Sequence, residues 1–102
     1  MTEVRYSILP TGGDATRYYL CCEGHATGSQ DVCAAVSAIV ASLAGYLENV
    51  EGWSDRCLDD GYAEIVFDTV SEKVVGAWEM AVFGLKQLAH TFGDFVRVTY
   101  IQ

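Results

Sequence analysis

The chain has 102 residues, about half of them apolar, with one proline and no low-complexity tract. This composition suits a single globular domain spanning 1–102 and argues against disorder. Fourteen acidic residues against six Lys and Arg give a formal charge of −8. Nucleic-acid binding depends on neutralising phosphates with Lys and Arg, so no nucleic-acid partner is expected.

The start of the chain lacks the apolar segment of a signal peptide, and the apolar stretches look too short to cross a bilayer. We therefore expect a cytoplasmic protein without membrane contact. Its four cysteines are then expected to be reduced and not bridged.

The N-terminal quarter of the chain has the alternation of a β-hairpin. Two strand-like runs, 4–8 and 17–23, flank a glycine-rich turn at 10–14. In the second run Cys22 has the parity of core-facing side chains, and Gly24 ends the strand. Two strands paired around this turn are therefore predicted.

A helical pattern follows over 31–48. Its apolar residues fall on one stripe: Val32, Val36, Ile39, Val40, Leu43 and Leu47. Ser29 or Asp31 is suited to cap this helix, because short polar side chains accept hydrogen bonds from first-turn N–H groups. With Asp31 as the cap, Cys33 lies in the first turn, where the helix dipole acts most strongly.

The remaining pattern completes an α+β fold. The predicted elements are a weak strand at 50–57, a hairpin turn at 59–61, a strand at 62–67, a helix that opens on a capping box at 69–72 and ends near Gly93, and a strand at 95–101. The order β-β-α-β-β-α-β predicts a two-layer sandwich, a five-stranded mixed sheet with both helices on one face. The other face is then open or covered by a second subunit.

The segment from Gly24 to Cys33 carries the candidate chemistry. A cysteine at a helix N-terminus feels the positive end of the dipole, which favours thiolate over thiol. A neighbouring imidazole can take the thiol proton and stabilise the ion pair. His25 and Cys33 are therefore a candidate base and nucleophile.

A metal site is the other chemistry that these residue types allow, with ligands from Cys21, Cys22, His25 and Cys33. Adjacent strand residues point to opposite faces, so the first two cannot easily share one ion. We expect no metal and no other cofactor. The cysteines other than Cys33, namely Cys21, Cys22 and Cys57, are expected to be packing residues.

The segments 24–26 and 31–37, Gly-His-Ala and Asp-Val-Cys-Ala-Ala-Val-Ser, resemble the signature of the ribosomal-processing cysteine protease family, Prp. The element order extends the resemblance over the whole chain. It implies a homodimeric cysteine endopeptidase that removes an N-terminal extension from the precursor of ribosomal protein L27. Phage-linked members imply capsid or scaffold precursors instead. The resemblance places the catalytic histidine on His25, the catalytic cysteine on Cys33 and a supporting serine on Ser37.

The link between the two motifs departs from the family pattern. Only Val32 separates Asp31 from Cys33, where the family has two apolar residues. Asp31 is therefore interpreted first as a helix cap and second as a group that orients the histidine. Gly24 is a supporting residue at the start of the link.

Two other functions fit the same fold. A non-catalytic assembly factor would bind a polypeptide by strand addition or at the open sheet face. A thiol redox sensor would oxidise Cys33 and resolve it with another cysteine. Thiol reactivity separates these hypotheses, because only the protease requires one reactive thiol that depends on His25. The sequence does not distinguish a ribosomal from a phage precursor as substrate.

Overall fold

The computed structural model describes residues 1–24, 29–51, 55–59 and 61–102, with 51 and 55–57 described by their backbone alone. Its elements are β1 (Thr2–Pro10), β2 (Thr16–Glu23), α1 (Gln30–Tyr46), a π-helical turn η1 (Leu47–Glu51), β3 (Asp55–Asp59), β4 (Tyr62–Thr69), α2 (Glu72–Thr91) and β5 (Val96–Tyr100). The predicted order of five strands and two helices is confirmed.

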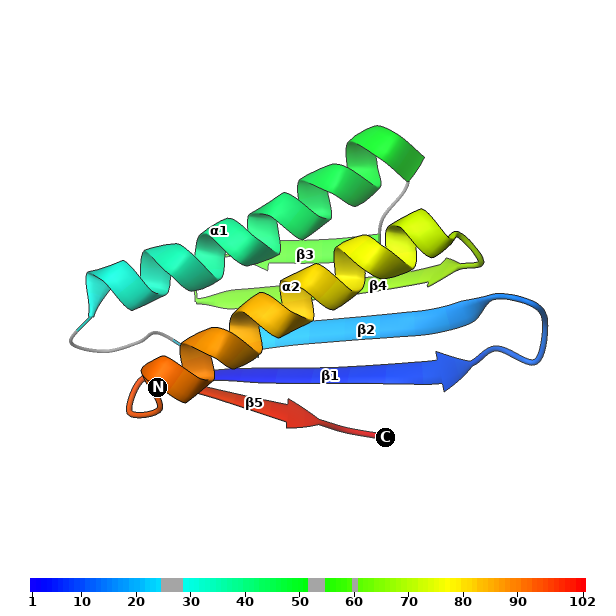
Figure 1. The fold of residues 1–102 in the computed structure, drawn as a ribbon. Coiled ribbons are helices and arrows are strands. Elements are labelled where there is room, and N and C mark those ends of the chain that lie inside the picture. The colour runs from blue at the N-terminus through cyan, green and yellow to red at the C-terminus, as the bar shows by residue number, and fades with distance from the viewer. Residues whose placement is uncertain (25–28, 52–54, 60) are drawn as a thin grey trace.

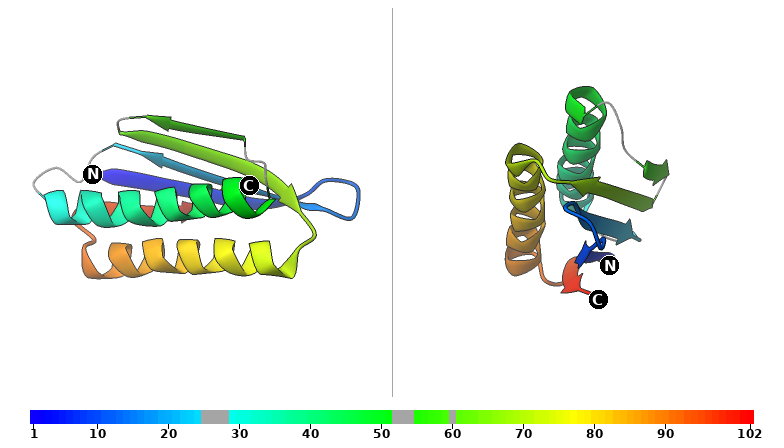
Figure 2. Two further views of the ribbon diagram at one scale, coloured as in Figure 1. Left: turned by 90° about the horizontal axis from the view of Figure 1, so that it is seen from above. Right: turned by 90° about the vertical axis from the view of Figure 1, so that its right-hand side faces the viewer.

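The five strands form one mixed sheet in the order β3-β4-β2-β1-β5. β1 and β5 pair in parallel, and the other neighbours pair antiparallel. Both helices cover the same face of this sheet (Figure 1). Seen from above, they lie side by side and run in opposite directions (Figure 2). The predicted two-layer α+β sandwich is therefore confirmed.

Of the two caps predicted for α1 the structure selects Ser29, whereas the cap of α2 differs from the predicted one. Ser29 caps α1, and its side-chain oxygen accepts a hydrogen bond from the N–H of Val32 at 3.3 Å. Asp31 is therefore not the cap but an acidic residue of the first turn, where the positive helix end favours it. Ser71 caps α2 in the same way, so the second helix begins later than the capping box at 69–72 predicted.

The weak strand expected at 50–57 is confirmed only in its second half. The chain continues from α1 through η1 to Glu51, and β3 begins at Asp55. The side chain of Asn49 donates to the carbonyl of Gly45 at 2.8 Å, which helps to prolong the helical path. The apolar pattern around Val50 therefore belonged to the end of the helical segment.

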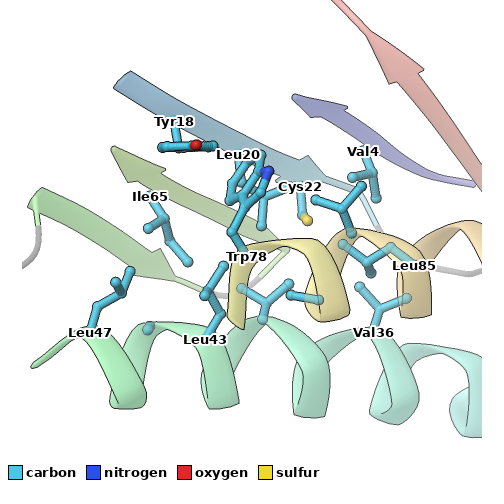
Figure 3. Close-up of a cluster of buried hydrophobic side chains, with 14 of the residues drawn as sticks. Val4, Tyr18, Leu20, Cys22, Val36, Leu43, Leu47, Ile65, Trp78 and Leu85 are labelled. Carbon is cyan, nitrogen blue, oxygen red and sulfur yellow. The ribbon is translucent and has the colours of Figure 1, made fainter. Parts of the chain in front are cut away.

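The core lies between the sheet and the two apolar helix stripes. Trp78 of α2 stands at its centre and reaches toward Tyr18 and Leu20 of β2 (Figure 3). Its ring centroid lies 5.2 Å from that of Tyr18, 5.7 Å from that of Phe67 and 6.3 Å from that of Tyr6. Aromatic side chains bury large apolar areas, so this cluster connects α2 to β1, β2 and β4.

The face of the sheet without helices is polar. Arg5 pairs with Glu23 at 3.3 Å, and Arg17 pairs with Asp68 at 2.8 Å. The Arg17 guanidinium lowers the pKa of the Asp68 carboxyl. Cys21 is buried beneath these side chains, with its sulfur 3.9 Å from a guanidinium nitrogen of Arg5. It is a packing residue as expected, but on the polar side of the sheet.

The expectation that every apolar stretch is too short to cross a bilayer was wrong. The helical segment Gln30–Val50 has 21 residues and is long and apolar enough to cross a membrane by length and composition. In the structure, its stripe from Val32 to Leu47 packs against the sheet, as the stripe of a core helix does. Its apolar character is thus accounted for by packing within this chain.

Replacing Trp78 with alanine is expected to destabilise the protein by about 3–5 kcal/mol, because it leaves a cavity where four aromatic rings meet. Urea unfolding measures this loss. Met80→Ala is the matched control on the same helix, since Met80 is 73% exposed and should change stability by less than about 0.5 kcal/mol. Equal effects of both changes would contradict the assigned core.

Candidate functional site

Four parts of the chain meet at one end of the sheet: the start of β1, the end of β2, the start of α1 and the turn between β3 and β4 (Figure 1). The backbone N–H of Gly24 donates to the carbonyl of Gly61 at 2.8 Å and joins two of these parts. A cavity of about 510 Å³ lies between them.

The cavity has a helical wall and a hairpin wall. The helical wall consists of Cys33, Val36, Ser37, Val40 and Ala41 of α1. The hairpin wall consists of Leu58, Asp59, Gly61, Tyr62 and Ala63, and Thr2, Cys22 and Gly24 complete the lining. Cys33, Ser37 and Ala41 are four residues apart, so they follow one edge of the helix. The cavity is therefore a groove along α1 that begins near its first turn.

Cys33 lies in the first turn of α1, half-buried and packed against the core. Its backbone N–H donates to the carbonyl of the cap residue Ser29 at 3.2 Å. This hydrogen bond and the cap bond to Val32 fix the backbone from which the thiol projects. The predicted first-turn position of the candidate nucleophile is therefore present in the structure.

The structure brings three of the predicted site residues to one place: Gly24, Cys33 and Ser37 line the same cavity. Asp31 is exposed and does not line it. His25 lies outside the described residues, as do residues 26–28 of the link. The chain reaches His25 directly from Gly24.

Gly24 has a conformation and a neighbour that exclude a side chain. Its φ is +90°, a region that L-residues other than glycine rarely adopt. A Cβ atom there would lie 2.6 Å from the carbonyl oxygen of Met1. The N-terminal backbone thus packs directly on the residue that precedes His25.

A second thiol, that of Cys22, lines the cavity from the sheet side. Cys22 is buried among core side chains and points from β2 toward the helices (Figure 3). Burial raises the pKa of its thiol to about 12, so it remains protonated at neutral pH. Resolving a sulfenic acid requires a thiolate, which makes Cys22 a poor resolving cysteine.

The residues that the structure describes contain no cluster of metal ligands. Among them, no three His, Cys, Asp or Glu side chains gather closely enough to hold an ion. Asp59 is the charged side chain in the described lining of the cavity. The cavity lining thus offers thiol and hydroxyl groups beside apolar side chains.

No protein-family model and no curated protein sequence matches this chain. Solved structures do match it. The essential ribosomal processing protease Prp from S. aureus, in complex with a covalently linked product peptide, is 19% identical with a TM-score of 0.81 and covers 99% of this chain and 100% of that one. The same protease with a substrate peptide is 18% identical, with a TM-score of 0.79 and the same coverage.

A third match is SMU.848 from Streptococcus mutans, which is 25% identical with a TM-score of 0.75 and covers 99% of this chain and 94% of that one. All three similarities extend over essentially the whole chain. The resemblance to Prp noted in the sequence is thus confirmed for the fold.

Gly24→Ala is expected to destabilise the protein more than Gly12→Ala. Both glycines have positive φ, +90° and +88°, so alanine costs about 1–2 kcal/mol at each. Only at Gly24 would the added Cβ meet a backbone atom, whereas at Gly12 nothing lies within 4 Å. The contact adds about 1 kcal/mol or more. Thermal melts of the two variants measure the difference, and equal losses would refute the close approach to Met1.

Alkaline pH is expected to weaken the fold partly through Cys22. Its pKa is about 12 when folded, against a reference value of 9.0, so between these values the unfolded chain releases a proton that the folded chain retains. The contribution of Cys22 to the free energy of unfolding is therefore fully present below about pH 9 and is lost as the pH rises toward 12. Melting temperatures of the parent and Cys22→Ala across this interval measure the effect. An identical alkaline loss in both proteins would contradict it.

Proposed function

We propose that this chain is a cysteine endopeptidase of the Prp family that removes an N-terminal extension from a precursor protein, with the ribosomal protein L27 precursor as its substrate. The observation that supports it most is the position of Cys33. The thiol lies in the first turn of a capped helix, at the wall of a groove, in a fold shared with a protease that has been seen with a covalently linked product peptide.

In the proposed reaction the Cys33 thiolate attacks the scissile carbonyl carbon, and a C–S bond forms. His25 gives its proton to the departing amine as the C–N bond breaks. Water then attacks the thioester while His25 accepts its proton, and the acid product leaves with the thiolate restored. No cofactor is needed for these steps.

The helix cap limits which groups can stabilise the negative oxygen of the tetrahedral intermediate. The N–H groups of Val32 and Cys33 already donate to Ser29, at 3.3 and 3.2 Å. The first-turn donors without an intrahelical acceptor are those of Gln30 and Asp31. The hydroxyl of Ser37, one turn beyond Cys33 on the cavity wall, is a further donor. We assign it this supporting role.

The groove suits an extended polypeptide. Its apolar lining includes Val36 and Val40 on the helix and Leu58 on the hairpin, with Leu58 46% exposed. An extended chain places alternate side chains toward and away from such a surface, which allows one apolar side chain to enter. The chain's net charge of −8 favours a basic precursor.

The proposal also includes a homodimer in the cytoplasm, as the family resemblance implies. A reducing compartment keeps the Cys33 thiol available. Light scattering coupled to gel filtration measures the mass, for which a dimer of the 11.1 kDa chain predicts twice that value.

Cys33 is expected to be the fastest of the four cysteines to react with iodoacetamide near neutral pH, since both the helix dipole and His25 favour its thiolate. Brief labelling followed by peptide mass spectrometry identifies the site. His25→Ala should slow the labelling of Cys33 and leave the other cysteines unchanged. Labelling led by Cys21, Cys22 or Cys57 would reject the proposed dyad.

Cys33→Ala and His25→Ala are each expected to abolish cleavage of the L27 precursor, because the first removes the nucleophile and the second removes the acid and base. Alanine suits a half-buried position in a helix, so Cys33→Ala should cost less than about 1 kcal/mol of stability. Intact mass after incubation measures cleavage, and a thermal melt controls for folding. Full cleavage by folded Cys33→Ala would reject the protease and favour the assembly factor.

A further inference from the structure

Thr2 is a buried polar residue at the site, and its sequence context indicated no role for it. It is 3% exposed, lies at the start of β1 and lines the cavity that also holds Cys33. Buried hydroxyls are almost always hydrogen-bonded, so the partner of this one is informative. The side-chain oxygen of Thr2 donates to the carbonyl oxygen of Gly24 at 3.4 Å.

Both polar backbone groups of Gly24 are therefore bonded to other elements. Its N–H donates to Gly61 in the β3–β4 turn at 2.8 Å, and its carbonyl accepts from Thr2. The carbonyl of Met1 packs against the α-carbon of Gly24, and a Cβ added there would lie 2.6 Å from the Met1 carbonyl oxygen. Thr2 is itself held by a hydrogen bond from its N–H to the carbonyl of Phe95 at 2.8 Å.

Covalent geometry gives this contact a consequence for the next residue. The carbonyl of Gly24 and the nitrogen of His25 belong to one peptide unit, which is planar. Fixing the carbonyl oxygen therefore fixes the plane from which the chain enters His25. A glycine at φ +90° would otherwise leave this plane free to rotate.

We propose that Thr2 is a positioning residue of the active site, which holds the Gly24 carbonyl and thereby the peptide unit that leads into the proposed base, His25. This inference rests on the proposed function. Thr2 acts through Gly24 and takes no part in the bond changes. Its hydroxyl, not its shape, is the group that matters.

The pH dependence of Cys33 alkylation tests the proposal without knowledge of the substrate. Thr2→Val keeps the shape and removes the donor, while Thr2→Ser keeps the donor. We expect Thr2→Val to move the iodoacetamide profile of Cys33 upward by about one pH unit, which lowers the rate about tenfold on the rising limb of the profile. Thr2→Ser should retain the parent profile. Intact mass verifies that every variant carries the same N-terminus.

Thr11→Val is the matched control. Thr11 also donates its hydroxyl to a backbone carbonyl, that of Ala15 at 2.7 Å, but in the β1–β2 turn outside the cavity lining. It should leave the profile of Cys33 unchanged. With the L27 precursor, Thr2→Val is expected to lower kcat about tenfold and to change KM by less than about twofold, since a displaced base weakens the chemical step and not binding.

The outcomes separate the inference from the proposed function. If His25→Ala leaves the alkylation of Cys33 as it is in the parent protein, the dyad is overturned, and the role of Thr2 with it. If the alkylation of Cys33 depends on His25 but Thr2→Val leaves its pH profile unchanged, the role of Thr2 alone is overturned. If Thr2→Val does not fold, Thr2→Ser and Thr2→Ala carry the test, because these two differ only in the hydroxyl. Equal profiles in that pair also overturn the inference.

Discussion

The packing of both helices on one apolar face of the sheet is the constraint on which the rest of the structure depends. Trp78 connects α2 to three strands at once, because its ring contacts rings from β1, β2 and β4. With α1 held on that face, Gly24 and Ser29 lie only five residues apart in sequence at the same end of the sheet. The end of β2 and the start of α1 therefore share a rim, and the cavity forms there.

The same constraint gives the cysteines different chemical environments. Cys22 lies in the core between the layers and is held as a thiol by burial, whereas Cys21, one residue earlier, lies on the polar face near Arg5. Cys33 is half-buried at a helix start and lines the groove. Differences in burial thus distinguish a candidate nucleophile from neighbours of the same residue type.

The cap of α1 illustrates a compromise between rigidity and catalysis. Ser29 accepts hydrogen bonds from Val32 and Cys33, which holds the first turn in place. These N–H groups are then engaged and are not available to an oxyanion. A side-chain donor on the next turn, such as Ser37, compensates in the proposed mechanism. The supporting serine and the cap are therefore parts of one arrangement.

The sequence by itself determined the element order, the two helix stripes and the position of Cys33 in a first turn, because periodicity and turn chemistry are local properties. It left the cap of α1 open, since Ser29 and Asp31 are equally suited to capping until the chain path selects one, and it placed the cap of α2 too early. Only the tertiary structure decided that Thr2, Gly24 and Gly61 meet, because residues far apart in the chain become neighbours through strand order. Periodicity shows which side chains face a partner, but it does not identify that partner.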